Sequence, residues 1–373
     1  MKIKLIHYIH GLTMGGAETL VKDYCLLLDR EKFDVSVLCM DRCDTPYERI
    51  LEDAGIRILY ISDEIEKHIP RDCGILGKIC RRALLYREVR RILRRERPDV
   101  VHTHLTLNRY VLAAGLPRTT KIFHTVHTKP SNLWRGDLLH WMEYGAMLRL
   151  LQTHTVQILT LHEGMRQEVR ALFHTEQVQV LNNGVDFHRF EGLPSGAEVR
   201  MREGIPPTAF VIGHVGRFSE EKNHLFLLEI FAEVKRQQPR AFLLLVGNGD
   251  LKQKVEERAA ELGLTDSMKI LSNRTDVPEL MRAMDRFVFP SMYEGLPVSL
   301  IEAQMMKLPC TVSSTVTKRV RISNLVQQLD LSEPPASWAK VILSDGPAQA
   351  EYRNAEEWDM NQVIRQLEKL YLA

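Results

Sequence analysis

Residues 209–216 read AFVIGHVG, a short apolar run that ends in glycine, and the fold follows from how often this kind of run recurs. Three similar runs come after it: AFLLLVG at 241–247, MKILSN at 268–273 and RFVFPS at 286–291. Helical stretches lie between them, such as LKQKVEERAAELG at 251–263. Short apolar strands that alternate with helices are typical of a parallel sheet wrapped by helices. The second half of the chain is therefore predicted to be an α/β domain.

An earlier series of apolar runs shows the same alternation in the first half of the chain. These runs lie at 3–10, 33–40, 56–62, 99–105 and 120–127. Each is followed by a turn or a helical stretch, which again predicts a parallel sheet with helices between its strands. The fold class is therefore α/β, with two Rossmann-like, doubly wound parallel-sheet domains and a ligand cleft expected between them.

The boundary between the two domains is expected in NNGVDFHRFEGLPSG, residues 182–196, because its Asn, Gly and Pro content suits a connection. We place the first domain at 1–183 and the second at 184–354. Residues 355–373 form a last helical segment, which could pack on either half and is a candidate to pack back on the first.

Composition limits the class of protein. The chain has 373 residues, of which 45% are hydrophobic and 26% charged, and a formal net charge of +2, so no nucleic acid partner is indicated. Its six cysteines include no CxxC pair and no zinc-ligand spacing, which favours reduced thiols in a cytosolic protein. The N-terminus reads as a first strand and not as a signal peptide. No segment approaches the roughly 20 apolar residues of a membrane span.

The candidate site consists of the residues that follow the strands, because ligands bind open parallel sheets at the carboxyl ends of their strands. The first strand is followed by GLTMGGAE, which contains Gly11, Gly15 and Gly16. The first strand of the second half is followed by Arg217 and Lys222, and the next strand by a Gly-Asn-Gly turn. Glycine loops and cations that meet at one sheet edge indicate a diphosphate ligand.

YEGLPVSLIEAQ, residues 293–304, supplies the other half of the predicted phosphate site. Pro297 suits the first position of a helix, which places the helix N-terminus near Gly295–Val298. A helix N-terminus attracts anions, phosphate above all. Two carboxylates, Glu294 and Glu302, bracket this helix start. Glu302 lies too far into the helix to be explained by the helix dipole, so a ligand with hydroxyl groups is indicated.

Each feature also has a structural explanation. The glycines could serve a tight turn, and their spacing is not the G-x-G-x-x-G of dinucleotide sites. The two cations could be a solvated pair balanced by Glu220 and Glu221, and the two glutamates could be surface carboxylates at a helix start. These explanations must be repeated independently for each feature. One nucleotide diphosphate at the strand ends explains all of them.

Four motifs carry a family resemblance that covers nearly the whole chain. They are GGAE near the N-terminus, NGVD at the join, GRFSEEKN after residue 215, and the E-x7-E element from Glu294 to Glu302. With these motifs the sequence resembles the retaining glycosyltransferases of family 4, which have the GT-B fold. Within that family it is most similar to bacterial transferases of exopolysaccharide or capsule clusters, particularly in GHVGRFSEEKNHLFLLEIF and MYEGLPVSLIEAQ.

The resemblance implies a role for each matching position. Glu302 is expected to hold the ribose hydroxyls of a UDP-sugar or, less favoured, a GDP-sugar, and Glu294 a hydroxyl of the donor sugar. Arg217 and Lys222 are expected to neutralise the diphosphate. The implied donor site comprises Gly15, Gly16, Arg217, Lys222, Asn273, Arg274, Glu294, Gly295, Leu296, Pro297, Val298 and Glu302, with Asn273 and Arg274 near the base. The implied catalytic residues are His127, Glu294, Arg217 and Lys222.

His127 follows a strand of the first half in HTVHT and matches the active-site histidine of the family. The resemblance implies that it faces the donor sugar and donates or accepts a hydrogen bond with a sugar hydroxyl. The alternative is that it is one of fourteen histidines satisfied within the fold. His102, His104 and His124 belong to the same sheet edge and are candidates for an acceptor pocket.

The chemistry follows from charge. Cleavage between an anomeric carbon and a phosphate leaves negative charge on the diphosphate, so electrostatic stabilisation of this leaving group is the main catalytic task. Two cations and a helix N-terminus can supply it. The chain has no D-x-D motif, so no metal and no other cofactor is expected. Retention, which the resemblance implies, has the acceptor attack from the face that the diphosphate leaves.

Residues 75–97, ILGKICRRALLYREVRRILRRER, suggest where the acceptor lies. This predicted helix holds nine Lys or Arg against two Glu. Its apolar side is made by Ile75, Ile79, Leu84, Val89, Ile92 and Leu93. A basic amphipathic helix can rest on anionic lipid, so we expect peripheral attachment to the cytoplasmic face of the membrane and a lipid-linked saccharide acceptor. The alternative is a solvated helix whose apolar stripe packs on the sheet, and both can hold at once.

Two departures and three alternatives remain. Lys307 stands where the family has glycine or a small residue, and the segment 311–325 lacks the usual glycines, so the rim of the donor pocket could differ. A sugar-nucleotide 2-epimerase of the same fold would need an acid/base pair that the sequence does not show. A catalytically silent partner would leave the set of charged residues unexplained. Glycoside hydrolysis by Glu294 and Glu302 is opposed by the adjacent phosphate-type site.

Overall fold

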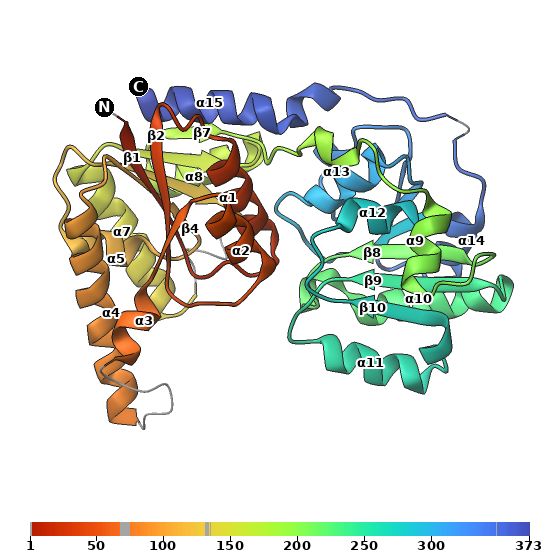
Figure 1. Ribbon diagram of the computed structural model, residues 1–373. Helices are drawn as coiled ribbons and strands as arrows, with labels where there is room; N and C mark the ends of the chain where they lie inside the picture. The colour runs from red at the N-terminus through yellow and green to blue at the C-terminus, as the bar shows by residue number, and fades with distance from the viewer. Residues whose placement is uncertain (1, 68–74, 131–133, 135, 348) are drawn as a thin grey trace. The chain divides into compact units, whose positions relative to one another are not determined.

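The computed structural model describes residues 2–67, 75–130, 134, 136–347 and 349–373. The chain forms two compact units (Figure 1). The first contains Met1–Asn183 and Asn361–Ala373, and the second contains Gly184–Met360. The second unit therefore continues past residue 354, where the sequence placed its end.

The first unit is built on a seven-stranded sheet, within the described residues, whose strands pair in parallel throughout. The strand order is β3-β2-β1-β4-β5-β6-β7. The strands are β1 (Ile3–Ile9), β2 (Phe33–Cys39), β3 (Arg57–Tyr60), β4 (Val100–His104), β5 (Lys121–Val126), β6 (Val156–Thr160) and β7 (Val178–Val180). The sequence analysis predicted the first five and did not identify the last two, the five-residue β6 and the three-residue β7 at the edge of the sheet.

The second unit has a six-stranded parallel sheet in the order β10-β9-β8-β11-β12-β13. Its strands are β8 (Phe210–Val215), β9 (Ala241–Val246), β10 (Met268–Leu271), β11 (Arg286–Phe289), β12 (Cys310–Ser313) and β13 (Val326–Leu329). Four were predicted. The other two, β12 and β13, were not, because their runs CTVS and VQQL mix polar with apolar residues. The predicted α/β class with two Rossmann-like parallel sheets is confirmed.

Helices connect the strands in both units. In chain order they are α1 (Gly16–Leu27), α2 (Pro46–Asp53), α3 (Ile61–Glu66), α4 (Ile75–Glu96), α5 (Asn108–Ala114), α7 (Leu138–Thr153), α8 (Glu163–Phe173), α9 (Gly196–Glu203), α10 (His224–Gln237), α11 (Lys252–Glu261), α12 (Val277–Arg282), α13 (Val298–Met305), α14 (Pro335–Leu343) and α15 (Met360–Leu372). Short 3-10 turns lie at Phe187–Phe190, Glu220–Lys222, Thr265–Ser267, Lys318–Val320 and Ala355–Trp358. Among the described residues, no helix is both long and apolar enough to cross a bilayer.

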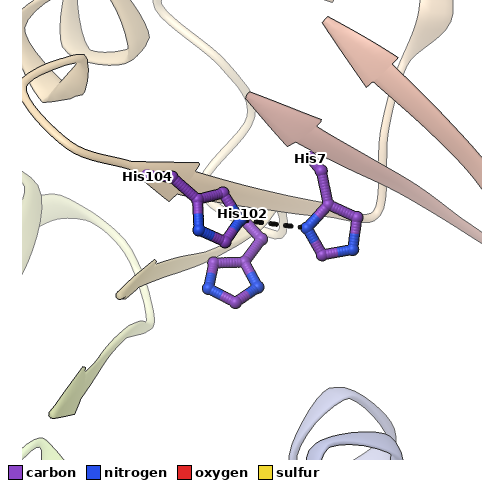
Figure 2. Close-up of side chains that lie close together, drawn as sticks. All are labelled: His7, His102 and His104. Atoms are coloured by element: carbon purple, nitrogen blue, oxygen red, sulfur yellow. Dashed lines mark hydrogen bonds between the residues drawn. The ribbon is translucent and has the colours of Figure 1, made fainter. Parts of the chain in front are cut away.

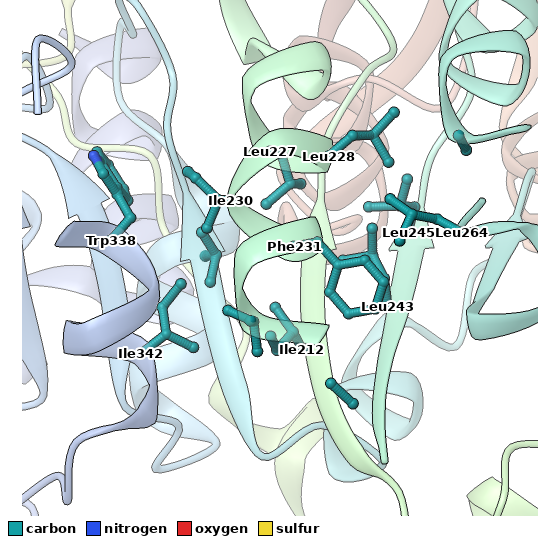
Figure 3. Packing of buried hydrophobic residues seen from close by; sticks show 14 of the residues in the cluster. Ile212, Leu227, Leu228, Ile230, Phe231, Leu243, Leu245, Leu264, Trp338 and Ile342 are labelled. Atoms are coloured by element: carbon teal, nitrogen blue, oxygen red, sulfur yellow. The ribbon is translucent and has the colours of Figure 1, made fainter. Parts of the chain in front are cut away.

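The core of the second unit lies between its sheet and α10 and α14 (Figure 3). Leu227, Phe231 and Val234 recur at the three- to four-residue spacing that gives α10 one apolar face, and all are fully buried. Trp338 of α14 packs beside them, with its indole N–H donating to the carbonyl of Asp330 at 3.3 Å. Each such side chain contributes about 1.5–3 kcal/mol when buried.

The last helix, α15, belongs to the first unit although it ends the chain. Tyr371 is fully buried there, and its ring packs edge-on against Phe123 with 4.8 Å between ring centroids. Lys121 Nζ donates to the carbonyl of Tyr371 at 3.2 Å, and Glu368 accepts from the backbone N–H of Asp29 at 2.9 Å. These contacts join the two ends of the chain in one domain.

Helix α13 begins one residue later than predicted, and the way it ends explains the position of Lys307. Pro297 is the N-cap, with ψ 92°, and Val298 is the first helical residue, one position later than predicted. At the other end Lys307 has φ 61°, and Leu308 N donates to the carbonyl of Ala303 at 3.0 Å. This is the left-handed position that ends helices and favours glycine. Lys307, which stands where the family has glycine or a small residue, therefore lies in the C-terminal cap of the helix. A lysine at this position lowers the stability of the fold by about 1 kcal/mol relative to glycine.

Candidate active site

Lys222 and Glu294, predicted separately, form an ion pair in the second unit. Lys222 Nζ lies 2.7 Å from Glu294 Oε1, and both side chains are about nine-tenths buried, at 14% and 10% exposure. Lys222 ends the 3-10 turn after β8, and Glu294 follows β11, the strand that pairs with β8. Nζ also lies 4.7 Å from the centroid of the Phe289 ring. The alternative that Lys222 is balanced by Glu220 or Glu221 is thus not what the structure shows.

The loop after β8 is held against its neighbours by backbone contacts. Met292 N donates to the carbonyl of Glu221 at 2.7 Å, which ties this loop to the one after β11. A Cβ at Gly247 would lie 2.0 Å from the carbonyl oxygen of Gly216, so this part of the Gly-Asn-Gly turn has a packing role. Arg217 is exposed at the same edge of the sheet. The structure therefore brings both predicted cations to the carboxyl ends of β8 and β11.

The helix start at α13 keeps the character expected of an anion site. Gly295 and Val298 are partly exposed, Leu296 and Pro297 are buried, and no side-chain cap occupies this helix end among the described residues. The first N–H groups of a helix have no intrahelical partner, so a helix end of this kind offers donors to an anion.

Glu302 is 8% exposed, and its Oε1 lies 3.6 Å from a guanidinium nitrogen of Arg189. Arg189 comes from the 3-10 turn that follows the NGVD motif, and the sequence analysis did not single it out. The NGVD motif was the sequence signal for this segment. It did not indicate which side chain of the segment reaches α13.

The two residues expected near the base have different surroundings. Asn273 is exposed, adopts the left-handed conformation with φ 55°, and accepts from the Asn248 amide at 3.4 Å. Arg274 is bound by two carboxylates, Glu203 at 2.8 Å and Asp276 at 2.5 Å. Its guanidinium is therefore engaged within the second unit, so a contact with the base is better supported for Asn273.

The glycine loop of the first unit follows β1. Gly15 is the N-cap of α1 with φ −106° and ψ 174°, an extended conformation that any residue adopts. A Cβ at Gly16 would meet no described atom within 4 Å, whereas a Cβ at Gly11 would lie 2.5 Å from Cys43 Sγ. Close packing therefore explains Gly11 but not Gly16. The backbone conformation at Gly15 does not require glycine, and a role of this pair in ligand binding stays a prediction.

The predicted histidines of the first unit lie on β4, on β5 or directly after β5. His127 follows β5, is partly exposed, and has its Nε2 2.9 Å from Nδ1 of His104. Figure 2 shows His104 next to His7, with 3.1 Å between His104 Nε2 and His7 Nδ1. His102 and His124 are fully buried, as is His104. These three were candidates for an acceptor pocket, but their burial leaves only His127 able to touch a ligand directly.

Comparison with known proteins identifies the chain. Residues 14–189 match the family described as Glycosyltransferase Family 4, and residues 197–341 match Glycosyl transferases group 1. The putative glycosyltransferase EpsF of Bacillus subtilis (strain 168) is 31% identical over 351 residues, which cover 91% of this chain and 86% of that protein. The chain belongs to the family 4 glycosyltransferases.

Two other comparisons agree with this glycosyltransferase assignment. The UDP-Gal:alpha-D-GlcNAc-diphosphoundecaprenol alpha-1,3-galactosyltransferase of Escherichia coli is 25% identical over 84% of this chain and 80% of its own. The crystal structure of Anabaena HepE in complex with UDP and glucose has a TM-score of 0.73 at 18% identity and covers 100% of both chains. The predicted GT-B fold is confirmed, and the family favours sugar transfer over the epimerase and silent-partner alternatives.

Buried neutral histidines are a feature of both units of this glycosyltransferase. Burial lowers the pKa of His7 to about 3 and that of His127 to about 4. In the second unit burial lowers the pKa of His214 to about 3 and that of His224 to about 2. Both ring nitrogens of His224 have no hydrogen-bond partner among the described residues, and its ring stacks on Phe218 with 4.3 Å between centroids.

Replacement of His224 by Phe is expected to stabilise the protein more at pH 5 than at pH 8. Below about pH 6.5 this histidine is protonated in the unfolded chain but not in the folded chain. The unfolded state therefore binds more protons, and the free energy of unfolding decreases as the pH is lowered. One such histidine costs up to about 2 kcal/mol at pH 5. Urea unfolding at both pH values measures the effect.

The matched control is His188→Phe, because the His188 side chain is 74% exposed in the same unit. It should leave the pH dependence of the unfolding free energy unchanged. If His224→Phe also left that dependence as steep as in the wild type, burial of a neutral His224 would be wrong.

Proposed function

We propose that this glycosyltransferase transfers a sugar, with retention and without a metal, from a UDP-sugar to a lipid-linked saccharide in exopolysaccharide or capsule biosynthesis. The observation that carries the proposal is the Lys222–Glu294 pair, which stands beside the uncapped start of α13. A buried cation and a helix N-terminus at one sheet edge can bind the diphosphate of a nucleotide-sugar donor and stabilise it as it leaves. The carboxylate at the same edge can accept a hydrogen bond from a hydroxyl of the sugar.

The donor is proposed to bind to both members of the Lys222–Glu294 ion pair without separating them. A lysine ammonium has three N–H donors, so Lys222 can bind a phosphate oxygen and keep a contact with Glu294. Glu294 then has an oxygen left to accept from a hydroxyl of the sugar. Glu302 is placed to accept from the ribose hydroxyls, and Arg189 beside it helps to orient that carboxylate.

The transfer step is proposed to be driven by leaving-group stabilisation. As the anomeric C–O bond breaks, the diphosphate gains negative charge, which Arg217, Lys222 and the N–H groups at α13 stabilise. The acceptor hydroxyl attacks from the same face and passes its proton to a phosphate oxygen, so the anomeric configuration is retained. His127 is proposed to orient the sugar through a hydrogen bond.

The named substrates of the relatives support the choice of donor and acceptor. The Escherichia coli relative has a UDP-Gal donor and a diphosphoundecaprenol acceptor in its name, and the similar Anabaena structure contains UDP and glucose. UDP is therefore favoured over GDP for this chain, and a lipid diphosphate saccharide is the favoured acceptor.

Calorimetric titration with UDP, GDP and their sugars, in the presence of a chelator, tests the donor site. We expect UDP and one UDP-sugar to bind. Glu302→Ala should weaken that binding by about 10- to 100-fold, because charged hydrogen bonds to the ribose are lost. Glu261→Ala, an exposed carboxylate on α11, is the control that should bind as the wild type. Failure of every nucleotide to bind would contradict the proposed donor.

The second part of the proposal is peripheral attachment of the first unit to the cytoplasmic face of the membrane. Helix α4 packs against α3 and α5, and Val89, Ile92 and Leu93 are buried. These buried apolar residues of α4 therefore cover the domain, and the exposed cations of the helix are available to lipid. The side chains of Ile75 and Ile79, and all of Cys73, lie outside the described residues.

The arginines of α4 differ in their availability. Arg91 pairs with Glu64 and Glu88, and Arg95 with Glu96. Arg82 and Arg90 are exposed, and no ion pair to a described residue is found for either. The helix still has a large excess of positive charge, which anionic headgroups would neutralise at about 1 kcal/mol per cation.

An exposed apolar turn on α7 supports the same attachment. Leu138 is 74% exposed, Trp141 63% and Met142 42%, in the first turns of a helix that Asp137 caps. Helix α5 contacts both α4 and α7, so the cations and the apolar turn belong to one layer of helices. Tryptophan beside basic residues is typical of a surface that rests at the headgroup level of a membrane.

Intrinsic fluorescence with vesicles tests the attachment, because the other three tryptophans, at positions 134, 338 and 358, are at most 3% exposed. Vesicles with phosphatidylglycerol should shift the emission to the blue and sediment the protein, and phosphatidylcholine vesicles should do neither. Trp141→Phe should abolish the shift, and Arg82→Glu with Arg90→Glu should abolish sedimentation. Arg236→Glu in the second unit is the control. Equal recovery with both lipids would contradict the electrostatic attachment.

A further inference from the structure

Three histidines of the first unit form a continuous chain from the core to the sheet edge. His7 Nδ1 lies 3.1 Å from His104 Nε2, and His104 Nδ1 lies 2.9 Å from His127 Nε2. Figure 2 shows the inner link, between the ends of the neighbouring strands β1 and β4. The inner end of the chain is His7 Nε2, which is buried and has no hydrogen-bond partner among the described residues. The outer end is His127 Nδ1.

The protonation states of the three rings are coupled. Burial lowers all three pKa values, that of His104 well below its usual range, so each ring is neutral at pH 7. A neutral imidazole carries one N–H and one acceptor nitrogen. Two hydrogen bonds between three neutral rings are then satisfied in two ways only. Either all three rings carry the proton on Nδ1, or all three carry it on Nε2.

The inner end decides between these two states. If the protons are on Nε2, His7 has a buried N–H with no acceptor. If they are on Nδ1, His7 has a buried lone pair with no donor. Orphaned buried N–H groups are rarer in proteins than unsatisfied acceptors, so the Nδ1 state is favoured.

We propose that the His7–His104–His127 chain fixes His127 as the neutral Nδ1–H tautomer, so that its Nδ1–H is a hydrogen-bond donor to an oxygen of the bound sugar. His104 and His7 are then positioning residues. That the oxygen belongs to the sugar rests on the proposed function, but the tautomer itself does not. A neutral donor suits this step, because an imidazolium would repel the positive charge that develops on the sugar ring.

A metal ion is the other way to explain this cluster. Nitrogens of His7, His102 and His104 lie within 4.8 Å of one another. His102, however, is bonded at both nitrogens, to Tyr371 Oη at 2.6 Å and to Thr125 Oγ1 at 2.7 Å. His7 Nδ1 and His104 Nε2, which face each other, already form a hydrogen bond. Metal binding would break these hydrogen bonds, so the hydrogen bonds are the better explanation of the close approach.

Nitrogen NMR of the full chain, labelled with ¹⁵N at histidine and free of substrate, tests the proposal. Long-range correlations at pH 7.5 should show Nδ1 protonated and Nε2 unprotonated in all three rings. His104→Leu should move His127 toward protonation at Nε2, and His104→Asn, whose amide can still donate, should keep the wild-type pattern. His102→Leu is the matched control, because that ring stacks on His104 at 4.3 Å but lies outside the chain.

In a transfer assay His104→Leu should lower kcat by about 3- to 10-fold, the worth of one hydrogen bond, and His104→Asn should restore it. Protonation of His127 at Nε2 in the wild type, an unchanged pattern in folded His104→Leu, or zinc-induced shifts of the His7, His102 and His104 signals would each overturn the proposal. The expected tautomers without any sugar transfer would instead contradict the proposed function.

Discussion

The reversal of strand order in each sheet is the constraint on which the sites depend. In the first unit β1 lies beside β4, and in the second β8 lies beside β11. At such a point the chain leaves two neighbouring strands toward opposite faces of the sheet, which opens a crevice at their carboxyl ends. The Lys222–Glu294 pair spans β8 and β11, and the His7–His104 contact spans β1 and β4. Both clusters therefore lie where the topology leaves room for a ligand.

Burial gives these two clusters opposite electrostatic characters. In the second unit a lysine and a glutamate are largely buried together as an ion pair. In the first unit burial removes charge, because the histidines are neutral and satisfy one another. The sheet edge of the second unit therefore carries an ion pair, and that of the first unit carries neutral rings.

The sequence predicted the elements better than the contacts between side chains. Nine strands followed from their apolar runs, whereas β7 has only three residues and β12 and β13 mix polar with apolar residues. Arg217, Lys222 and Glu294 were found because each follows a strand, and Glu302 because it lies too far into α13 to be explained by the helix dipole. The ion pair between Lys222 and Glu294 was not predicted, because it depends on β8 lying next to β11. That adjacency is set by the strand order of the sheet and is not visible in the sequence. The histidine chain was hidden for the same reason.

We propose that cations and a helix N-terminus of the second unit stabilise the leaving diphosphate with no metal. The rate of sugar transfer from a UDP-sugar to a lipid diphosphate saccharide, measured in a chelator for the wild type, Lys222→Met and the control Lys254→Met on α11, tests this mechanism. We expect full activity for the wild type and the control, and a loss of about 10²- to 10³-fold for Lys222→Met. Loss of wild-type activity in the chelator, or full activity of folded Lys222→Met, would contradict it.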